Sequence, residues 1–264
     1  MVLTRAQLPA DAYDAIAERY TELLATDGVP HDTAIPVLLD LLGPLAGRRV
    51  LDLACGTGRL SRRLAEAGAD AVVAVDLSRE LLRHAVDTEW QQPRAITYLH
   101  DDAQTLGSVG DASLDAVACC LALADIADLD AVYRAVWRVL RSGGVFAWVV
   151  NHPAAPVSGG NGKLHPLPIP YHEATCWRSG NPESVRSLVP TWHRPLAAYV
   201  NRALAVGFVL APPAPLREVP APPQVLARHP LYRHLPYLLA VRLQKCSTAG
   251  ASSHGGSYTH EEAP

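Results

Sequence analysis

Short, nearly continuous apolar runs alternate with segments of helical periodicity through the middle of this chain. Such runs are typical of strands buried on both faces, which occur in parallel sheets covered by helices. The pattern therefore predicts an α/β fold built on a parallel sheet. The expected strands are Val50–Leu53, Ala71–Val75, Ile96–Leu99, Leu114–Cys120 and Val145–Val150, and the expected helices between them are Arg59–Ala67, Ser78–Thr88 and Leu129–Leu140.

The two ends of the chain follow other patterns. Residues Asn151–Arg194 have no clear periodicity, yet they contain aromatic side chains that argue against simple disorder. Before the first strand, apolar residues at helical spacing predict two helices, Asp11–Leu24 and Thr33–Leu42, separated at Asp27–Pro30. After residue 194 we expect a helix over Leu196–Val206, a proline-rich connection over Ala211–Pro223, a strand over Tyr237–Leu243 and a disordered tail, Ser247–Pro264.

Composition excludes several classes of protein. The formal net charge of -3 argues against a nucleic-acid partner, which would require a basic face to neutralise phosphates. The five cysteines show no paired CxxC spacing, so we expect neither disulfides nor a metal site. No apolar run reaches the roughly 18 residues of a membrane span, and Met1–Ala10 lacks the pattern of a secretion signal. A cytoplasmic protein with no membrane partner is expected.

A glycine-containing turn, Asp52–Gly58, lies between the first strand and the following helix, where nucleotide-binding turns occur. Gly56 and Gly58 allow the backbone to turn tightly and to approach a ligand. Acidic residues also follow the strands: Asp52 on the first, Asp76 on the second, and Asp102, with Asp101 as its competitor, on the third. Carboxyl ends of parallel strands line one crevice, the usual ligand site of such sheets. The alternative is that these glycines and acids only form turns and helix caps.

The ordered motifs of this region resemble those of class I S-adenosylmethionine-dependent methyltransferases. The resemblance is carried by VLDLACGTGRLS (Val50–Ser61), Val75–Ser78, Asp102–Ala103 and Arg138–Gly144. It implies a Rossmann-like fold with a mostly parallel seven-stranded sheet, and S-adenosyl-L-methionine as the cofactor, with S-adenosyl-L-homocysteine as the product. NAD is disfavoured, because Ser61 stands where a dinucleotide fingerprint requires glycine or alanine and because Asp52 would repel a pyrophosphate.

The resemblance also implies roles for individual residues. Asp52 and Gly56 would hold the methionine end of the cofactor, Asp76 its ribose, and Asp102 its adenine. Ala54 departs from the family, which often has glycine there, but this change is not expected to abolish binding. The other expected cofactor contacts are Gly58, Leu77, Ala103, Cys119 and Tyr20.

The resemblance divides the chain into functional segments. It implies an N-terminal helical lid (1–45), a cofactor-binding core (46–153), a cap over the acceptor pocket (154–195), the C-terminal part of the sheet (196–246) and the tail (247–264). Motifs such as Asn151–Pro153 and Thr191–Leu196 also resemble a bacterial branch acting on small molecules, many in secondary metabolism and antibiotic biosynthesis.

The acceptor is therefore expected to be a small molecule, methylated on oxygen, nitrogen or carbon. Candidate bases or orienting groups are His193, His152 and His172, with Tyr20 as a further candidate; each histidine has a structural alternative as a hydrogen-bonding group. Cys119 and Cys120 are expected to be buried strand residues rather than nucleophiles. The protein is expected to be a monomer or a homodimer. Two alternative functions remain open: a non-methylating enzyme on the same fold, such as a cyclase, decarboxylase or isomerase, and a non-catalytic binding subunit.

Overall fold

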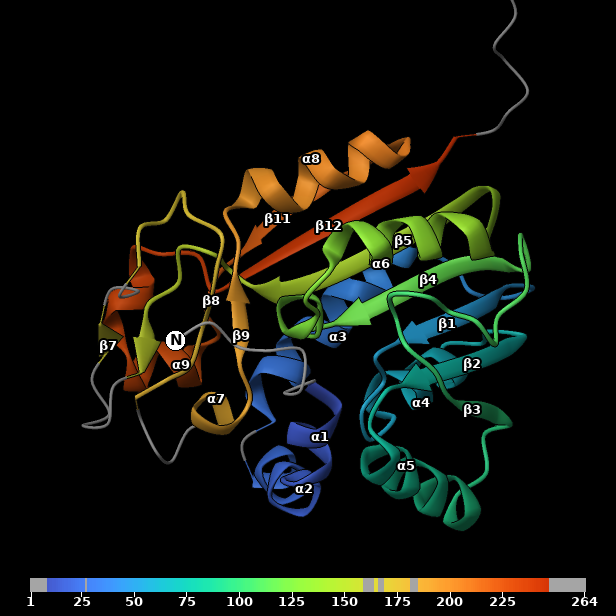
Figure 1. Ribbon diagram of the computed structural model, residues 1–264, viewed down its shortest axis with the longest axis horizontal. Helices are drawn as coiled ribbons and strands as arrows, with labels where there is room; N and C mark the ends of the chain where they lie inside the picture. The colour runs from blue at the N-terminus through green and yellow to red at the C-terminus, as the bar shows by residue number, and fades with distance from the viewer. Residues whose placement is uncertain (1–8, 27, 159–163, 166–168, 181–184, 247–264) are drawn as a thin grey trace, which may run out of the picture.

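A twisted sheet forms the centre of the molecule in the computed structural model, which describes residues 9–26, 28–158, 164–165, 169–180 and 185–246 (Figure 1). The strand order is β10-β12-β5-β4-β1-β2-β3, with β11 also paired to β12. Strands β1 to β5 run parallel to one another, whereas β12 is antiparallel to β5. Their bounds are β1 (Arg49–Leu53), β2 (Ala71–Asp76), β3 (Ile96–His100), β4 (Leu114–Cys120), β5 (Leu140–Asn151), β10 (Phe208–Leu210), β11 (Leu216–Val219) and β12 (Leu238–Lys245). The expected α/β class and mostly parallel sheet are confirmed.

The edge position next to β12 is occupied by two strands in succession. Phe208–Leu210 pairs with one half of β12 and Leu216–Val219 with the other, on the side that β5 leaves open. The sheet thus has eight strands in seven positions. One of these strands, β11, lies within the proline-rich connection expected over Ala211–Pro223. Pro212 and Pro213 separate it from β10, and pairing to β12 resumes after them.

Helices cover both faces of the sheet because alternate residues of each strand point to opposite sides. On β1, Leu51 and Leu53 belong to the core that packs against α6 and α8, whereas Val50 belongs to the core that packs against α3 and α4. Figure 1 shows the two layers on either side of the strands. The helices are α3 (Val29–Leu42), α4 (Arg59–Glu66), α5 (Arg79–Gln91), α6 (Leu129–Val139) and α8 (Leu196–Val206).

The N-terminal segment differs from the expected single helix. It forms α1 (Pro9–Asp14) and α2 (Ala17–Thr26), with a break at Ala15 and Ile16. Leu23, expected on the buried stripe, is 40% exposed, whereas Leu24 is buried. Helix α3 begins at Val29, earlier than expected, because proline is well tolerated in the first turn of a helix, where Pro30 lies.

The region after β5 contains short paired elements in place of an irregular segment. Two antiparallel pairs, β6 with β7 and β8 with β9, form beside the short helix α7. The tail expected from Ser247 lies outside the described residues. The bounds are η1 (Leu123–Asp125), β6 (Val157–Ser158), β7 (Leu164–His165), β8 (Thr175–Trp177), α7 (Val185–Leu188), β9 (Thr191–His193), α9 (Pro223–Arg228) and η2 (Pro230–Arg233). In the part of the chain that the structure describes, no helix combines the length and apolarity of a membrane span.

Candidate functional site

A cavity of about 550 Å³ lies at the carboxyl ends of β1, β2, β3 and β4. This is the place where the topology of an open parallel sheet concentrates loops and ligands. Helices α1, α2 and the start of α3 supply residues to the same cavity, so the N-terminal segment folds against the strand ends. Among the residues expected at a cofactor site, the cavity is lined by Asp52, Ala54, Gly56, Asp76, Leu77, Asp102, Ala103 and Tyr20.

The turn after β1 brings backbone groups to the floor of the cavity. Ala54, Gly56 and Gly58 all have φ between 54° and 79°, in the left-handed region that residues other than glycine rarely adopt. Ala54 is therefore strained, and a glycine would adopt this backbone conformation at lower cost. Gly58 does not line the cavity; it is the left-handed N-cap of α4, and its Cα faces the ring of Tyr98.

Gly58→Ala is expected to destabilise the protein more than an ordinary glycine substitution at positive φ. The left-handed backbone conformation alone costs a residue with a side chain roughly 1–2 kcal/mol. In addition, a Cβ at this position would lie 2.5 Å from the Tyr98 hydroxyl oxygen, which is too close. Gly47→Ala is the matched control, because its φ is 77° but a Cβ there meets nothing within 4 Å. Urea unfolding should show the larger loss for Gly58→Ala; equal losses would mean that the close approach of Tyr98 is unimportant.

Asp52 is a fully buried acid with one oxygen left unpaired. Its Oδ2 accepts a hydrogen bond of 2.6 Å from the Ser61 hydroxyl, but its Oδ1 has no hydrogen-bond partner among the described residues. Burial raises the pKa of Asp52 from 3.8 to about 7, and the hydrogen bond from Ser61 only partly opposes this effect. A buried carboxylate oxygen without a partner fits a cationic group bound in the cavity.

Asp76 links two turns at the next strand. Its Oδ2 accepts from the Gly56 backbone N–H at 2.7 Å, and its Oδ1 accepts from the Ser78 N–H at 2.8 Å. Burial raises its pKa, with these backbone hydrogen bonds acting in the opposite direction. A carboxylate oxygen can accept more than one hydrogen bond, so Asp76 retains capacity to accept from a ligand.

The two acids after β3 have different surroundings. Asp101 accepts backbone N–H groups of Asp102, Gly107 and Ser108, together with the Ser108 hydroxyl. Although burial acts to raise the pKa of Asp101, the hydrogen bonds to its carboxylate hold this pKa below its usual value. Among the described residues, the Asp102 carboxylate accepts only from the backbone and side-chain amides of Gln104. Asp101 therefore organises the loop, and Asp102 is the less constrained acid in the cavity.

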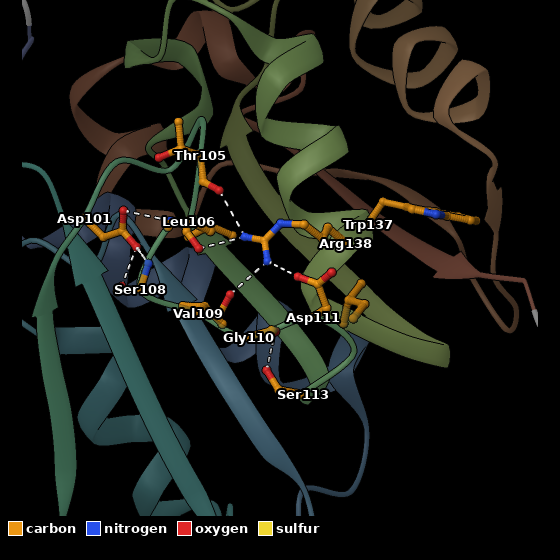
Figure 2. A network of polar contacts seen from close by, with 12 residues as sticks. Asp101, Thr105, Leu106, Ser108, Val109, Gly110, Asp111, Ser113, Trp137 and Arg138 are labelled. Atoms are coloured by element: carbon orange, nitrogen blue, oxygen red, sulfur yellow. Dashed lines mark hydrogen bonds and ion pairs between the residues drawn. The ribbon is translucent and has the colours of Figure 1, made fainter.

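Arg138 on α6 holds this loop in place from outside the cavity (Figure 2). Its guanidinium donates to the carbonyl oxygens of Thr105, Leu106 and Val109, and it pairs with Asp111. Three backbone carbonyls bound by one side chain fix the path of residues 105–111. Arg138 belongs to the motif expected at the end of α6, and its contacts explain how a residue remote from the cavity supports the position of Asp102.

The roof of the cavity is held by a polar cluster around Asp125, which we call the Asp125 cluster. Asp125 is buried, accepts from the Tyr13 hydroxyl at 2.7 Å and from Thr191 Oγ1 at 3.2 Å, and forms an ion pair with Arg186. The cluster joins α1, the turn after β4, α7 and β9. Burial raises the pKa of Tyr13 and of Tyr20, so both phenols remain protonated near neutral pH.

The three candidate histidines are placed elsewhere. His152 is buried, with one ring nitrogen 3.1 Å from Glu218 Oε1 and the other accepting from the Ala154 N–H. His193 is buried and donates to the Tyr171 carbonyl oxygen at 2.8 Å, whereas the side chain of His172 is 83% exposed. None of the three lines the cavity. The structural alternative, hydrogen bonding to other parts of the protein, describes the positions of His152 and His193.

Two further differences concern residues that sequence reasoning misplaced or missed. Cys119 is fully buried in the core, and its neighbour Cys120 lines the cavity instead, because successive strand residues face opposite sides. His31, at the start of α3, lines the cavity and was not among the candidates. The expected folding of the N-terminal helices over the crevice was the signal that could have identified it.

Comparison with known proteins agrees with this geometry. Residues 50–144 match the family model described as a methyltransferase domain. A ubiquinone biosynthesis O-methyltransferase from Xanthomonas oryzae pv. oryzae is 35% identical over 156 residues, which cover 56% of this chain and 64% of the relative. The match thus spans less than two thirds of that relative's length.

Solved structures match over more of the chain. An S-adenosylmethionine dependent methyltransferase from Mesorhizobium loti is 25% identical, covers 81% of this chain and 99% of its own, and has a TM-score of 0.64. A protein from Listeria monocytogenes described as a possible enzyme of the same type shares the fold, with 24% identity, coverage of 83% and 99%, and a TM-score of 0.68. Residues 50–144 therefore match a methyltransferase domain, and the chain has the fold of the class I S-adenosylmethionine-dependent methyltransferases.

Proposed function

We propose that this protein binds S-adenosylmethionine in the cavity at the strand ends and transfers its methyl group to a small-molecule acceptor. The observation that carries the proposal is the unpaired, buried Oδ1 of Asp52, which lies in the same cavity as Asp76 and Asp102. Acids at the ends of three neighbouring strands supply partners for a cationic amine, a ribose and an adenine amine in that order. When bound, S-adenosylmethionine supplies a methyl group activated by a positively charged sulfur.

The chain's own residues bind and orient the two ligands. Asp52 holds the amine of the methionine end, Asp76 accepts from the ribose hydroxyls, and Asp102 accepts from the adenine amine. Leu77 and Ala103 enclose the adenine. Because the donor is already activated, alignment of the reacting groups and exclusion of water make the main contribution to the rate. The Asp125 cluster serves this purpose, because it holds α1 and β9 against the turn after β4.

The acceptor is proposed to be a small molecule of bacterial metabolism rather than a nucleic acid. The formal net charge of -3 does not favour binding to phosphates. The relative from Xanthomonas is an O-methyltransferase by name, so we propose that the acceptor atom is the oxygen of a hydroxyl group. The motifs after β5 resemble enzymes of secondary metabolism, and we propose a role there.

Calorimetric titration with S-adenosylhomocysteine tests the proposed function. Wild-type protein is expected to bind it with 1:1 stoichiometry. A folded protein, shown by a cooperative thermal transition, that does not bind would remove the basis of the proposal. If binding is observed, turnover of a methyl acceptor should release one S-adenosylhomocysteine per product; its absence would favour a non-methylating enzyme on the same fold.

Asp76→Ala is expected to weaken the binding of S-adenosylhomocysteine about tenfold to a hundredfold. The variant removes charge-assisted hydrogen bonds, each worth roughly 1.5–3 kcal/mol, and releases the Gly56 and Ser78 amides that shape the site. Asp87→Ala is the control, because Asp87 is exposed and forms only a surface pair with Arg83. Calorimetry of both variants measures the effect, and an unchanged affinity of Asp76→Ala would exclude Asp76 from the ribose site.

A further inference from the structure

The cavity extends beyond the acids that would hold the cofactor. In the order β4-β1-β2-β3, Asp102, Asp76 and Asp52 occupy the ends of β3, β2 and β1. The remaining part of the cavity lies at the end of β4, beneath the N-terminal helices. We call it the β4 end, and we assign to it the cavity residues that come from the N-terminal helices or lie at the end of β4, namely Tyr13, Tyr20, Leu24, His31, Cys120 and Leu121. This part adjoins Asp52, where the methionine end is proposed to bind.

Side chains at the β4 end are mostly apolar or already paired. The Tyr13 hydroxyl donates to Asp125, and Arg59 donates to the Leu24 carbonyl oxygen and to Asp32. In contrast, the Nδ1 of His31 is buried and has no hydrogen-bond partner among the described residues. A buried polar atom without a partner costs roughly 1–3 kcal/mol, so an unpaired ring nitrogen on a residue that lines the cavity favours a ligand that completes it.

The charge of His31 limits which ligand fits. Burial, together with the charge of Arg59, lowers the pKa of His31 to about 4, and Arg186 acts more weakly in the same direction. Asp32 opposes this shift without reversing it. The ring is therefore neutral near pH 7, with one nitrogen that donates and one that accepts. A neutral ring does not repel a positively charged sulfur nearby, and it offers no ion pair to a charged acceptor.

We propose that His31 binds the reacting hydroxyl of the acceptor, in an apolar subsite at the β4 end that selects a small, uncharged molecule carrying that hydroxyl. This inference rests on the proposed function, because it takes the neighbouring acids to be the cofactor site. It assigns acceptor binding to α3, whereas the rings of His152 and His193 bond to Glu218 and to the Tyr171 carbonyl oxygen. His31 acts by orienting the hydroxyl towards the donor.

Phenol is a suitable probe, since it is small, apolar and neutral and carries a single hydroxyl. Protein labelled with 15N at histidine and saturated with S-adenosylhomocysteine is titrated with phenol, and the ring nitrogens of His31 are followed by NMR. We expect saturable shifts of His31 with phenol. Toluene, which lacks the hydroxyl, and benzylamine, which is a cation at neutral pH, should each bind at least about tenfold more weakly, as expected for one hydrogen bond of roughly 1.4 kcal/mol.

Variants separate a ligand-binding role from a structural one. His31→Phe is expected to weaken phenol binding about tenfold while the affinity for S-adenosylhomocysteine changes less than twofold, and His31→Gln should retain part of the phenol affinity. His84→Phe is the matched control, because the Nε2 of His84 is also buried without a partner but His84 does not line the cavity. Its phenol affinity should equal that of the wild type.

The possible failures are distinguishable. If wild-type protein does not bind S-adenosylhomocysteine, the proposed function itself is wrong. If it binds S-adenosylhomocysteine but phenol causes no saturable shift of His31, the inference is wrong and the proposed function stands. Equal phenol affinity of His31→Phe and wild type would likewise overturn it, and the wild-type NMR titration decides the matter should both His31 variants fail to fold.

Discussion

Asp52→Asn is expected to stabilise the ligand-free protein at pH 8 and to weaken its binding of S-adenosylhomocysteine about a hundredfold or more. In the folded protein, burial raises the pKa of Asp52 from 3.8 to about 7, so ionised Asp52 is destabilising there. One pKa unit corresponds to about 1.4 kcal/mol, which sets an upper bound of about 4 kcal/mol on the gain from removing the charge. Removing one partner of a buried charge pair costs roughly 2–5 kcal/mol of binding free energy.

The pH dependence of the free energy of unfolding tests whether the buried charge of Asp52 causes this stability difference. Because the folded state holds this proton up to about pH 7 and the unfolded state only to about pH 4, the contribution of Asp52 to wild-type stability falls as the pH rises between these values. Urea unfolding at pH 4, 6 and 8 should show this decrease in wild type and a smaller one in Asp52→Asn. Asp87→Asn, at an exposed position, should follow wild type. Identical slopes for wild type and Asp52→Asn would show that Asp52 does not retain a proton.

Ligand binding should respond to pH in the opposite sense. A bound amine requires ionised Asp52, so wild-type affinity for S-adenosylhomocysteine is expected to fall as the pH is lowered from 8 to 6. Calorimetry at the two pH values measures this change. Asp52→Asn should bind weakly at both, and a parallel pH dependence in the variant would place the titrating group elsewhere.

Asp125→Ala is expected to lower the free energy of unfolding by about 3 kcal/mol or more. The variant removes the buried Asp125 carboxylate from the Arg186 guanidinium, whose side chain is 25% exposed, and breaking a buried ion pair on one side typically costs 3–5 kcal/mol. It also removes the acceptor of the Tyr13 and Thr191 hydroxyls. Although burial alone lowers the pKa of Arg186, the Asp125 carboxylate raises it above its usual value, so Arg186 remains charged.

A double variant provides the control for this prediction. Asp125→Leu combined with Arg186→Met replaces both charges by apolar groups and should recover most of the stability lost in Asp125→Ala. Urea unfolding of the two variants and the wild type measures the difference. If the urea midpoint of unfolding is the same for Asp125→Ala and for the wild type, the Asp125 cluster does not hold α1 against the cap.

The central sheet was predictable because the signals for it are local. Strand β4 has the expected bounds, and β1, β2 and β3 differ by one residue at an end, since continuous apolar runs followed by glycine or acidic residues mark buried parallel strands. Strand β5 begins at Leu140, earlier than expected. Residues 141–144 form an irregularity between two pairs of its ladder to β4, and a turn within a ladder is indistinguishable in sequence from a loop.

The parts that sequence reasoning missed depend on distant partners. His152 and His193 have the chemistry of a base, but Glu218 and the Tyr171 carbonyl occupy their rings, and no local pattern encodes those contacts. Conversely, His31 is separated in sequence from the acids of the cavity and reaches them only because α3 packs beside β4 and β5. The edge strands β10 and β11 are too short, and too close to prolines, to produce a strand pattern.

The interruption between β10 and β11 also affects how this edge behaves towards other chains. The backbone of β12 remains paired across the gap, because the Arg242 N–H donates to the Pro215 carbonyl oxygen and its carbonyl accepts from the Ala211 N–H. On the outer side, however, an incoming strand would meet only short ladders, broken at Pro212 and Pro213. Prolines and short edge strands prevent sheets from extending from one molecule into the next, so this edge carries built-in protection against aggregation.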